Sequence, residues 1–467
     1  MSTNRFNTGL VFVLACILLS FSAAVSAQDN NGRQQQLEQR VVQLEQQLAE
    51  LKSMVQAQKA APPAAAQNAV VAPKPVSGGG SGTLLGSNIS TAPALTIALH
   101  GFIDTSFFLQ SQDFTFGNGQ NAEFPVPNTG SNHTLSGLDV RNTRAWIDIE
   151  GAPLSNGWGI GGHLEGDFFG GFNGTGGYSA QQETPRLRQA FIKLSNADNG
   201  STVTIGQQWD LLFPGASVPE SLTHIAFPLG YASGMIGWRF PGVVWSQNLS
   251  QTKDAMALGL DLGAFSGSWN GPGSNTNFDT AANAKFSPQI EARLRAQSGD
   301  WLGYLVGHYS TEDLSGVGGG APTPITGKIT SWAVELGTTW HPGPWSLRAA
   351  AYDGKGLGQV FGALAQFGDI KEFGGYVQGG YKFTSNWALY AEYATGRPDK
   401  GDVITWMSHG SNGLLKSQQY ALDLIYADGP YGLGVEWMHA VLDSTTDGIT
   451  TSSTGGNQLS FSAIYRF

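Results

Sequence analysis

The chain has 467 residues, of which 64 are glycine, 11% are aromatic and only 13% are charged. A soluble globular protein usually carries about 25% charged residues, so this composition does not favour that class. The formal net charge of −10 argues against a nucleic-acid partner, which would need a basic surface. A chain of this length is expected to form more than one structural unit.

Residues 1–27 have the features of a signal peptide. Arg5 gives the positive start, residues 10–21 are apolar, and Ala-Val-Ser-Ala at 24–27 is a cleavage site of small residues. The apolar stretch is shorter than the roughly 20 residues of a membrane helix. The single cysteine, Cys16, lies within it, and lipid attachment there is the alternative to cleavage after residue 27. The mature chain has no thiol for a disulfide or a metal site.

Residues 28–59 are predicted to form a periplasmic coiled-coil helix. Apolar residues alternate at spacings of four and three, namely Leu37, Val41, Leu44, Leu48, Leu51 and Val55. Because this stripe is narrow, self-association is favoured over the alternative of a lone helix lying on its own barrel. Valine next to leucine in the core layers of the coiled coil favours a dimer of helices. This conflicts with the trimer that the family resemblance given below implies. Residues 60–94, rich in alanine, proline and glycine, predict a flexible linker.

From Leu95 onward the dominant pattern is alternation of apolar with small or polar residues, as in residues 421–426 and 432–437. Such strands cannot be buried on both faces, so the apolar face must meet lipid or a second sheet. Seven short turns, near residues 151–157, 197–200, 249–253, 297–300, 341–344, 384–386 and 428–430, separate the strands at one end. Eight longer loops lie near 111–137, 171–184, 210–236, 267–284, 312–327, 354–370, 397–416 and 443–455.

This alternation of short and long connections predicts about sixteen antiparallel strands. Short turns at one rim and long loops at the other are typical of an outer-membrane barrel, and an even strand number closes without an edge. Aromatic residues that follow the short turns would form the periplasmic girdle: Trp158, Trp301, Trp345, Trp387 and Tyr431. The sequence therefore predicts an all-β transmembrane barrel over residues 95–467, preceded by the coiled coil and located in the bacterial outer membrane.

Short blocks of the barrel resemble DcaP-type porins of the general bacterial porin superfamily. The similar blocks are residues 141–146 (RNTRAW), 184–191 (TPRLRQAF), 204–210 (TIGQQWD) and 218–222 (VPESL). Gln207-Gln208-Trp209-Asp210 departs from the commoner Gly-Gln-Thr-Trp-Ser of that family. The resemblance implies a homotrimer with an inward third loop at 210–236 and a preference for small anions such as dicarboxylates. The last strand, which ends on Phe467, resembles the signal that the barrel-assembly machinery is thought to recognise.

Seven arginines are predicted to face the lumen. Arg293 and Arg295 alternate with apolar residues, and arginine facing lipid costs about 2–4 kcal/mol at mid-bilayer. The same alternation points the other candidates inward: Arg144, Arg186, Arg188, Arg239 and Arg348. Their planar forks would bind small anionic or polar solutes that carry carboxylates. The alternative is a non-selective porin with a transverse field, in which these arginines pair with Asp148, Glu150, Glu165, Asp167, Glu291 and Glu392.

The third loop is the candidate constriction. It contains Asp210, Glu220 and His224, and a long segment without strand pattern usually has a function. Folding inward would set its acidic groups against the arginine wall, whereas the alternative is a loop that caps the barrel rim. His163, Glu165 and Asp167 could hold a metal in principle, but lining of the lumen is the favoured interpretation.

Three further functions are less well supported by the sequence. A sugar-type porin would need a track of inward aromatic residues, of which Trp146 and Tyr390 are the clearest. An outer-membrane enzyme would need Ser and His on the outer face, where the residues are almost wholly apolar. A structural tether of the envelope would leave the inward arginines without a role. We therefore expect no catalytic residue, no metal and no cofactor.

Overall fold

The computed structural model describes residues 89–92, 95–115, 117–127, 134–170, 183–250, 256–266, 287–314, 323–358, 362–364 and 367–467. The predicted signal peptide, the coiled coil and most of the linker lie outside these residues. Within the predicted linker, β1 (Ile89–Ala92) pairs with the first barrel strand, with Ile89 opposite Ile97. The segment before Leu95 therefore includes a short strand rather than linker alone.

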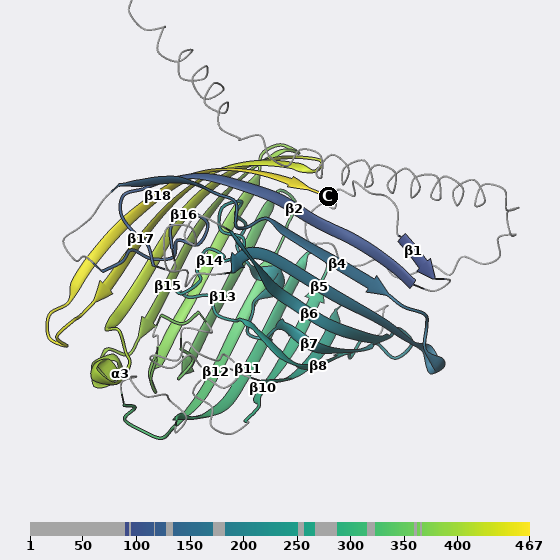
Figure 1. Cartoon of the computed structure of the whole chain (residues 1–467), viewed down its shortest axis with the longest axis horizontal. Helices are drawn as coiled ribbons and strands as arrows, with labels where there is room; N and C mark the ends of the chain where they lie inside the picture. The colour runs from purple at the N-terminus through teal and green to yellow at the C-terminus, as the bar shows by residue number, and fades with distance from the viewer. Residues whose placement is uncertain are drawn as a thin grey trace, which may run out of the picture. The chain divides into compact units, whose positions relative to one another are not determined.

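The described part of the chain forms a single sheet that closes on itself (Figure 1). Its strands are β2 (Leu95–Gln110), β3 (Leu135–Asp139), β4 (Arg144–Glu150), β5 (Trp158–Gly170), β6 (Thr184–Asn196), β7 (Ser201–Trp209), β8 (Arg239–Asn248), β9 (Ala257–Phe265), β10 (Gln289–Ser298), β11 (Trp301–Asp313), β12 (Lys328–Trp340), β13 (Trp345–Lys355), β14 (Lys371–Lys382), β15 (Trp387–Pro398), β16 (Leu414–Asp428), β17 (Tyr431–Ser444) and β18 (Ser452–Arg466).

Closure of the barrel confirms the predicted strand number. β3 and β4 both pair with β2 and together make one position in the wall, so the closed antiparallel barrel has 16 strands. The last strand, β18, pairs with β2, with Ile464 opposite Asp104. Phe467 and Gly101 exchange two backbone hydrogen bonds of 2.9 Å at this seam. No sheet edge is left between β18 and β2, as hydrocarbon surroundings require.

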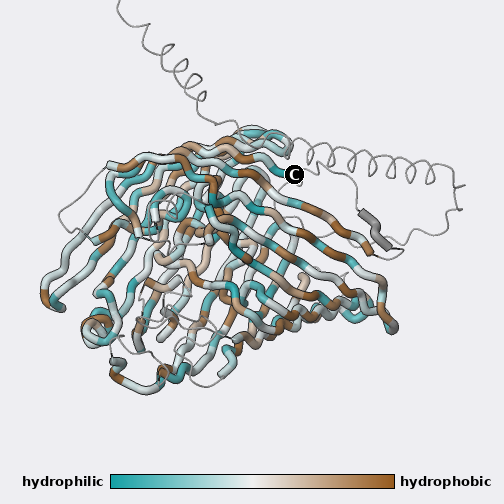
Figure 2. Tube along the Cα trace, in the orientation of Figure 1, coloured by the Kyte–Doolittle hydropathy of each residue, from teal (hydrophilic) through white to brown (hydrophobic). Residues whose placement is uncertain are grey.

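Side chains alternate between the two faces of the wall. On β12, Leu336 is 64% exposed on the outer face, whereas Glu335 is 1% exposed inside the barrel. Figure 2 shows the same alternation of hydrophobic and hydrophilic residues along the strands. The outer face is therefore suited to hydrocarbon, and the charged groups gather in the interior.

The connections follow the predicted alternation of short and long. The final long loop is shorter than predicted, because β17 continues to Ser444 and β18 begins at Ser452. The five predicted girdle residues each begin a strand, namely β5, β11, β13, β15 and β17. The short helices in the described part of the chain are η1 (Ser155–Gly157), η2 (Gly215–Ser217), α3 (Lys400–Trp406) and η5 (Met407–His409). No helix among the described residues is long and apolar enough to cross a membrane.

Candidate functional site: the pore constriction

The third loop connects β7 to β8 and runs through the barrel interior. At its base, the amide of Asp210 donates to the carbonyl of Trp238 at 2.8 Å. The next amide, of Leu211, donates to the Glu291 carboxylate of β10 at 2.6 Å. Asp210 itself is buried and accepts from the amide of Phe213 at 2.9 Å. The loop thus turns inward as soon as it leaves β7.

The middle of the loop is fixed to β13 and β14. The amide of Glu220 donates to Oε1 of Gln378 at 2.8 Å, and Nε2 of Gln378 donates back to the carbonyl of Glu220 at 2.9 Å. The Glu220 carboxylate accepts from Nη2 of Arg348 at 2.5 Å. The hydroxyl of Tyr376 donates to the carbonyl of Ser217 at 2.9 Å. These contacts hold the loop against the wall opposite its origin.

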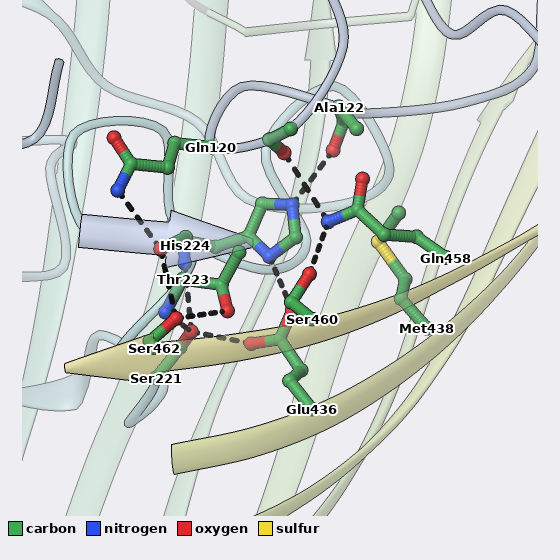
Figure 3. A network of polar contacts seen from close by, with 12 residues as sticks. Gln120, Ala122, Ser221, Thr223, His224, Glu436, Met438, Gln458, Ser460 and Ser462 are labelled. Carbon is green, nitrogen blue, oxygen red and sulfur yellow. Dashed lines mark hydrogen bonds and ion pairs between the residues drawn. The ribbon is translucent and has the colours of Figure 1, made fainter. Parts of the chain in front are cut away.

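His224 connects the third loop to both β17 and the first loop, as Figure 3 shows. Its Nδ1 lies 2.6 Å from Oε1 of Glu436, and its Nε2 lies 3.0 Å from the carbonyl oxygen of Ala122. Ser221 also donates to Glu436, and the hydroxyls of Thr223 and Ser462 are 2.9 Å apart. The His224 and Glu436 side chains are both buried. The first and third loops therefore narrow the lumen together.

The first loop contributes a buried carboxyl, Glu123. Burial raises the pKa of Glu123 well above its ordinary value, and the nearby Glu392 carboxylate adds to that rise. Within the described part of the chain, neither carboxyl has a hydrogen-bond partner. Two-residue alternation could not assign Glu123 to the lumen, because this residue lies in a loop rather than in a strand.

Four of the predicted arginines, which we call the arginine cluster, gather on one side of the lumen: Arg144, Arg186, Arg188 and Arg239. Arg186 donates two hydrogen bonds to Asp167, of 2.9 and 2.7 Å. Arg188 donates to Glu165 and, at 2.7 Å, to Asp167. The two carboxylates of β5 thus engage the two arginines of β6.

Arg144 and Arg239 have donors left over. Arg239 is 5% exposed, and its guanidinium lies over the rings of Trp209 and Trp238 at 4.7 and 4.4 Å. Among the described residues, Nη1 of Arg239 and both Nε and Nη2 of Arg144 have no hydrogen-bond partner. The cluster therefore sets four guanidinium groups against the carboxylates of Glu165 and Asp167. Such a buried excess of positive charge favours the binding of an anion.

The other predicted arginines lie elsewhere on the inner wall. Arg293 and Arg295 both point inward and share Asp261 of β9, with Nε distances of 2.9 and 2.7 Å to its Oδ2. Arg293 also donates to the carbonyl of Leu211 in the third loop, at 3.3 Å. Asp261 was not among the residues predicted from the sequence, although its position between Leu260 and Leu262 indicates that its carboxylate points inward.

The expected pairing of loop acids with the arginine wall needs correction. Glu220 does meet Arg348, but Asp210 lies near Glu291, and His224 binds Glu436. The arginine cluster is met by carboxylates of β5 instead. The third loop meets the cluster through an aromatic ring instead, because the Arg186 guanidinium lies 5.4 Å from the centroid of the Phe227 ring.

Two buried acids on the far wall are bound to tyrosine hydroxyls rather than to arginine. Glu335 accepts from the Tyr304 hydroxyl at 2.8 Å, and Glu372 accepts from the Tyr352 hydroxyl at 2.7 Å. Near the arginine side, Nδ1 of His163 lies 2.7 Å from Asp148. The residues described contain no group of three or more His, Cys, Asp or Glu that could hold a metal.

Comparison with known proteins agrees with this geometry. A family model described as "Phosphate-selective porin O and P" matches residues 313–406. The outer-membrane channel DcaP of Acinetobacter baumannii has a TM-score of 0.62 at 19% identity, covering 82% of this chain and all 100% of the DcaP chain. OmpT of Vibrio cholerae, outer-membrane expressed, has a TM-score of 0.50 at 13% identity, covering 81% of this chain and 99% of its own. No curated protein sequence matches the chain significantly.

The closed barrel and the inward loops give this chain the fold of the outer-membrane porin class, and the family model matches one part of it. Within that class, the resemblance to DcaP-type porins that the sequence indicated is confirmed.

Proposed function

We propose that the protein is a passive outer-membrane pore for small hydrophilic solutes that favours small anions such as dicarboxylates. One observation carries the proposal: four arginines gather around two carboxylates, and nitrogens of Arg144 and Arg239 have no hydrogen-bond partner among the described residues. The excess of positive charge in the cluster attracts a carboxylate that enters the lumen. A solute with two carboxylates is attracted more strongly than a solute with one.

A general porin with a transverse field is the second candidate. The observation that favours it is the gathering of buried carboxyls, including Glu123, Glu335 and Glu392, away from the arginine cluster. A field between arginines and acids would orient polar solutes of either charge without selecting anions.

The proposal also covers the oligomeric state of the protein and the position of its N-terminal segment. We expect a homotrimer, and one of the similar structures is the trimer form of OmpT of Vibrio cholerae. We further expect the C-terminal strand ending in Phe467 to engage the barrel-assembly machinery, and residues 28–59 to form a periplasmic coiled coil.

Planar-bilayer recordings test the selectivity. In a KCl gradient, the reversal potential of the full-length protein should indicate preference for chloride, and a dicarboxylate should reduce the current. Replacing both Arg144 and Arg239 with methionine should lower both effects. Arg397→Met, at an exposed position on β15, is the matched control and should change neither. Cation preference in the unmodified protein, without dicarboxylate block, would exclude the anion proposal.

A further inference from the structure

β6 carries one residue more than the facing segment of β5. Gln189 lies opposite Glu165, and Leu187 lies opposite Gly166, which leaves Arg188 without a partner on β5. An extra residue of this kind is a β-bulge, and it changes which face the following side chains occupy.

The bulge decides where both arginines of β6 point. Ala190 lies opposite Leu164, which is 47% exposed on the outer face, and two-residue alternation from Ala190 would put Arg188 and Arg186 on that lipid-facing side. The extra residue reverses the phase. Arg186 then lies opposite Asp167, and both guanidinium groups reach the lumenal carboxylates.

A bulge leaves backbone groups without hydrogen-bond partners in the sheet. Here the amide of a side chain takes the place of the missing partners. The pairing of β6 with β7 ends where Ala190 lies opposite Gln207, so Leu187 and Arg188 have no pair on β7. The Gln207 amide donates to the carbonyl of Arg188 at 2.9 Å and to that of Leu187 at 3.2 Å. A primary amide has two donor hydrogens, and these two carbonyls match them.

Gly206 lets the two strands approach closely enough for this contact. Its φ is +138°, and a Cβ there would lie 2.2 Å from the carbonyl oxygen of Ala190. Gln207 shares the face of Ala190 through their pairing, so its amide acts from the side of the wall that meets lipid. Unpaired carbonyls on that side would be costly because hydrocarbon offers no hydrogen bonds.

We propose that Gln207 is a positioning residue for anion selectivity: by binding the carbonyls of Leu187 and Arg188, its amide holds the bulge that turns Arg186 and Arg188 into the lumen. This inference rests on the proposed anion function. Gln207 touches no solute, and it acts from the far side of the wall through the backbone of β6.

The experiment compares two glutamines that make the same kind of contact. Gln247 of β8 also donates to two backbone carbonyls, of Asn199 at 2.7 Å and Asn248 at 2.9 Å, next to the short turn between β6 and β7. Gln207→Met and Gln247→Met remove the donors and keep the side-chain length. In bilayers of the full-length protein, Gln207→Met should lower the chloride-to-potassium permeability ratio by about a factor of two, whereas Gln247→Met should leave it unchanged.

Replacing both Arg186 and Arg188 with methionine separates the role of Gln207 from the anion function. If this double variant lowers the ratio and adding Gln207→Met lowers it no further, the positioning role is supported. If the double variant lowers the ratio but Gln207→Met alone does not, the role of Gln207 is overturned and the anion function stands. If the double variant has no effect, the role of Gln207 is overturned, and the variant of Arg144 and Arg239 described above decides the anion function. Should Gln207→Met fail to fold, Gln207→Asn, whose shorter amide cannot span both carbonyls, carries the same expectation.

Discussion

Nδ1 of His224 lies 2.6 Å from Oε1 of Glu436, and this buried contact joins the middle of the third loop to the wall at β17. Ser221 donates to the same carboxylate, so Glu436 binds two side chains of the loop. A loop held in this way cannot move freely in the lumen. The width of the pore therefore depends on residues more than 200 positions apart in the sequence.

We predict that Glu436→Gln loosens the third loop. Removing the charge of one partner from a buried pair typically costs about 3–5 kcal/mol, and here the cost would fall on the attachment of the loop. Single-channel recordings should show higher conductance and more frequent transitions than the unmodified pore. His439→Ala, an exposed contact of the same strand with Asn457, serves as the control. A variant with unchanged conductance and noise would mean that other contacts hold the loop.

Two lumenal acids should differ in what they contribute to stability. Asp261 is almost wholly buried and binds both Arg293 and Arg295, so Asp261→Asn should lower the free energy of unfolding by about 3–5 kcal/mol. The side chain of Glu220 is 45% exposed beside Arg348, so Glu220→Gln should cost less than about 1 kcal/mol. Urea unfolding followed by tryptophan fluorescence would measure both. Equal losses would contradict this ranking.

The seam between the first and last strands should be sensitive to small changes in volume. A Cβ on Gly101 would lie 2.6 Å from both the carbonyl oxygen of Arg144 and the ring of Phe467, whereas a Cβ on Gly307 would meet no atom within 4 Å. Gly101→Val should therefore destabilise the barrel by about 1–3 kcal/mol through overpacking. Gly307→Val, on β11, should have little effect. The heat stability of the folded form in detergent gels would compare them, and similar losses would argue against a tightly packed seam.

Much of this fold could be predicted from the local sequence pattern. Alternation along each strand is a property of neighbouring residues, so the sequence alone predicted a barrel of about sixteen strands and the inward direction of Arg293, Arg295 and Arg348. The contrast of short turns with long loops was equally local. These features needed no knowledge of which strand lies beside which, because hydrocarbon imposes the same requirement on every strand.

Tertiary structure decided which partners the inward groups have. Asp261 binds two arginines of the next strand, and Glu220 of the third loop binds Arg348 of β13 rather than an arginine of the cluster. The bulge at Arg188 depends on the length of β5 beside it and on Gln207 of β7. These outcomes rest on contacts between segments far apart in the chain, whose relative positions are fixed only when the barrel closes. The sequence by itself therefore determined the wall and the direction of its side chains, and closure determined which charges are paired and which remain free.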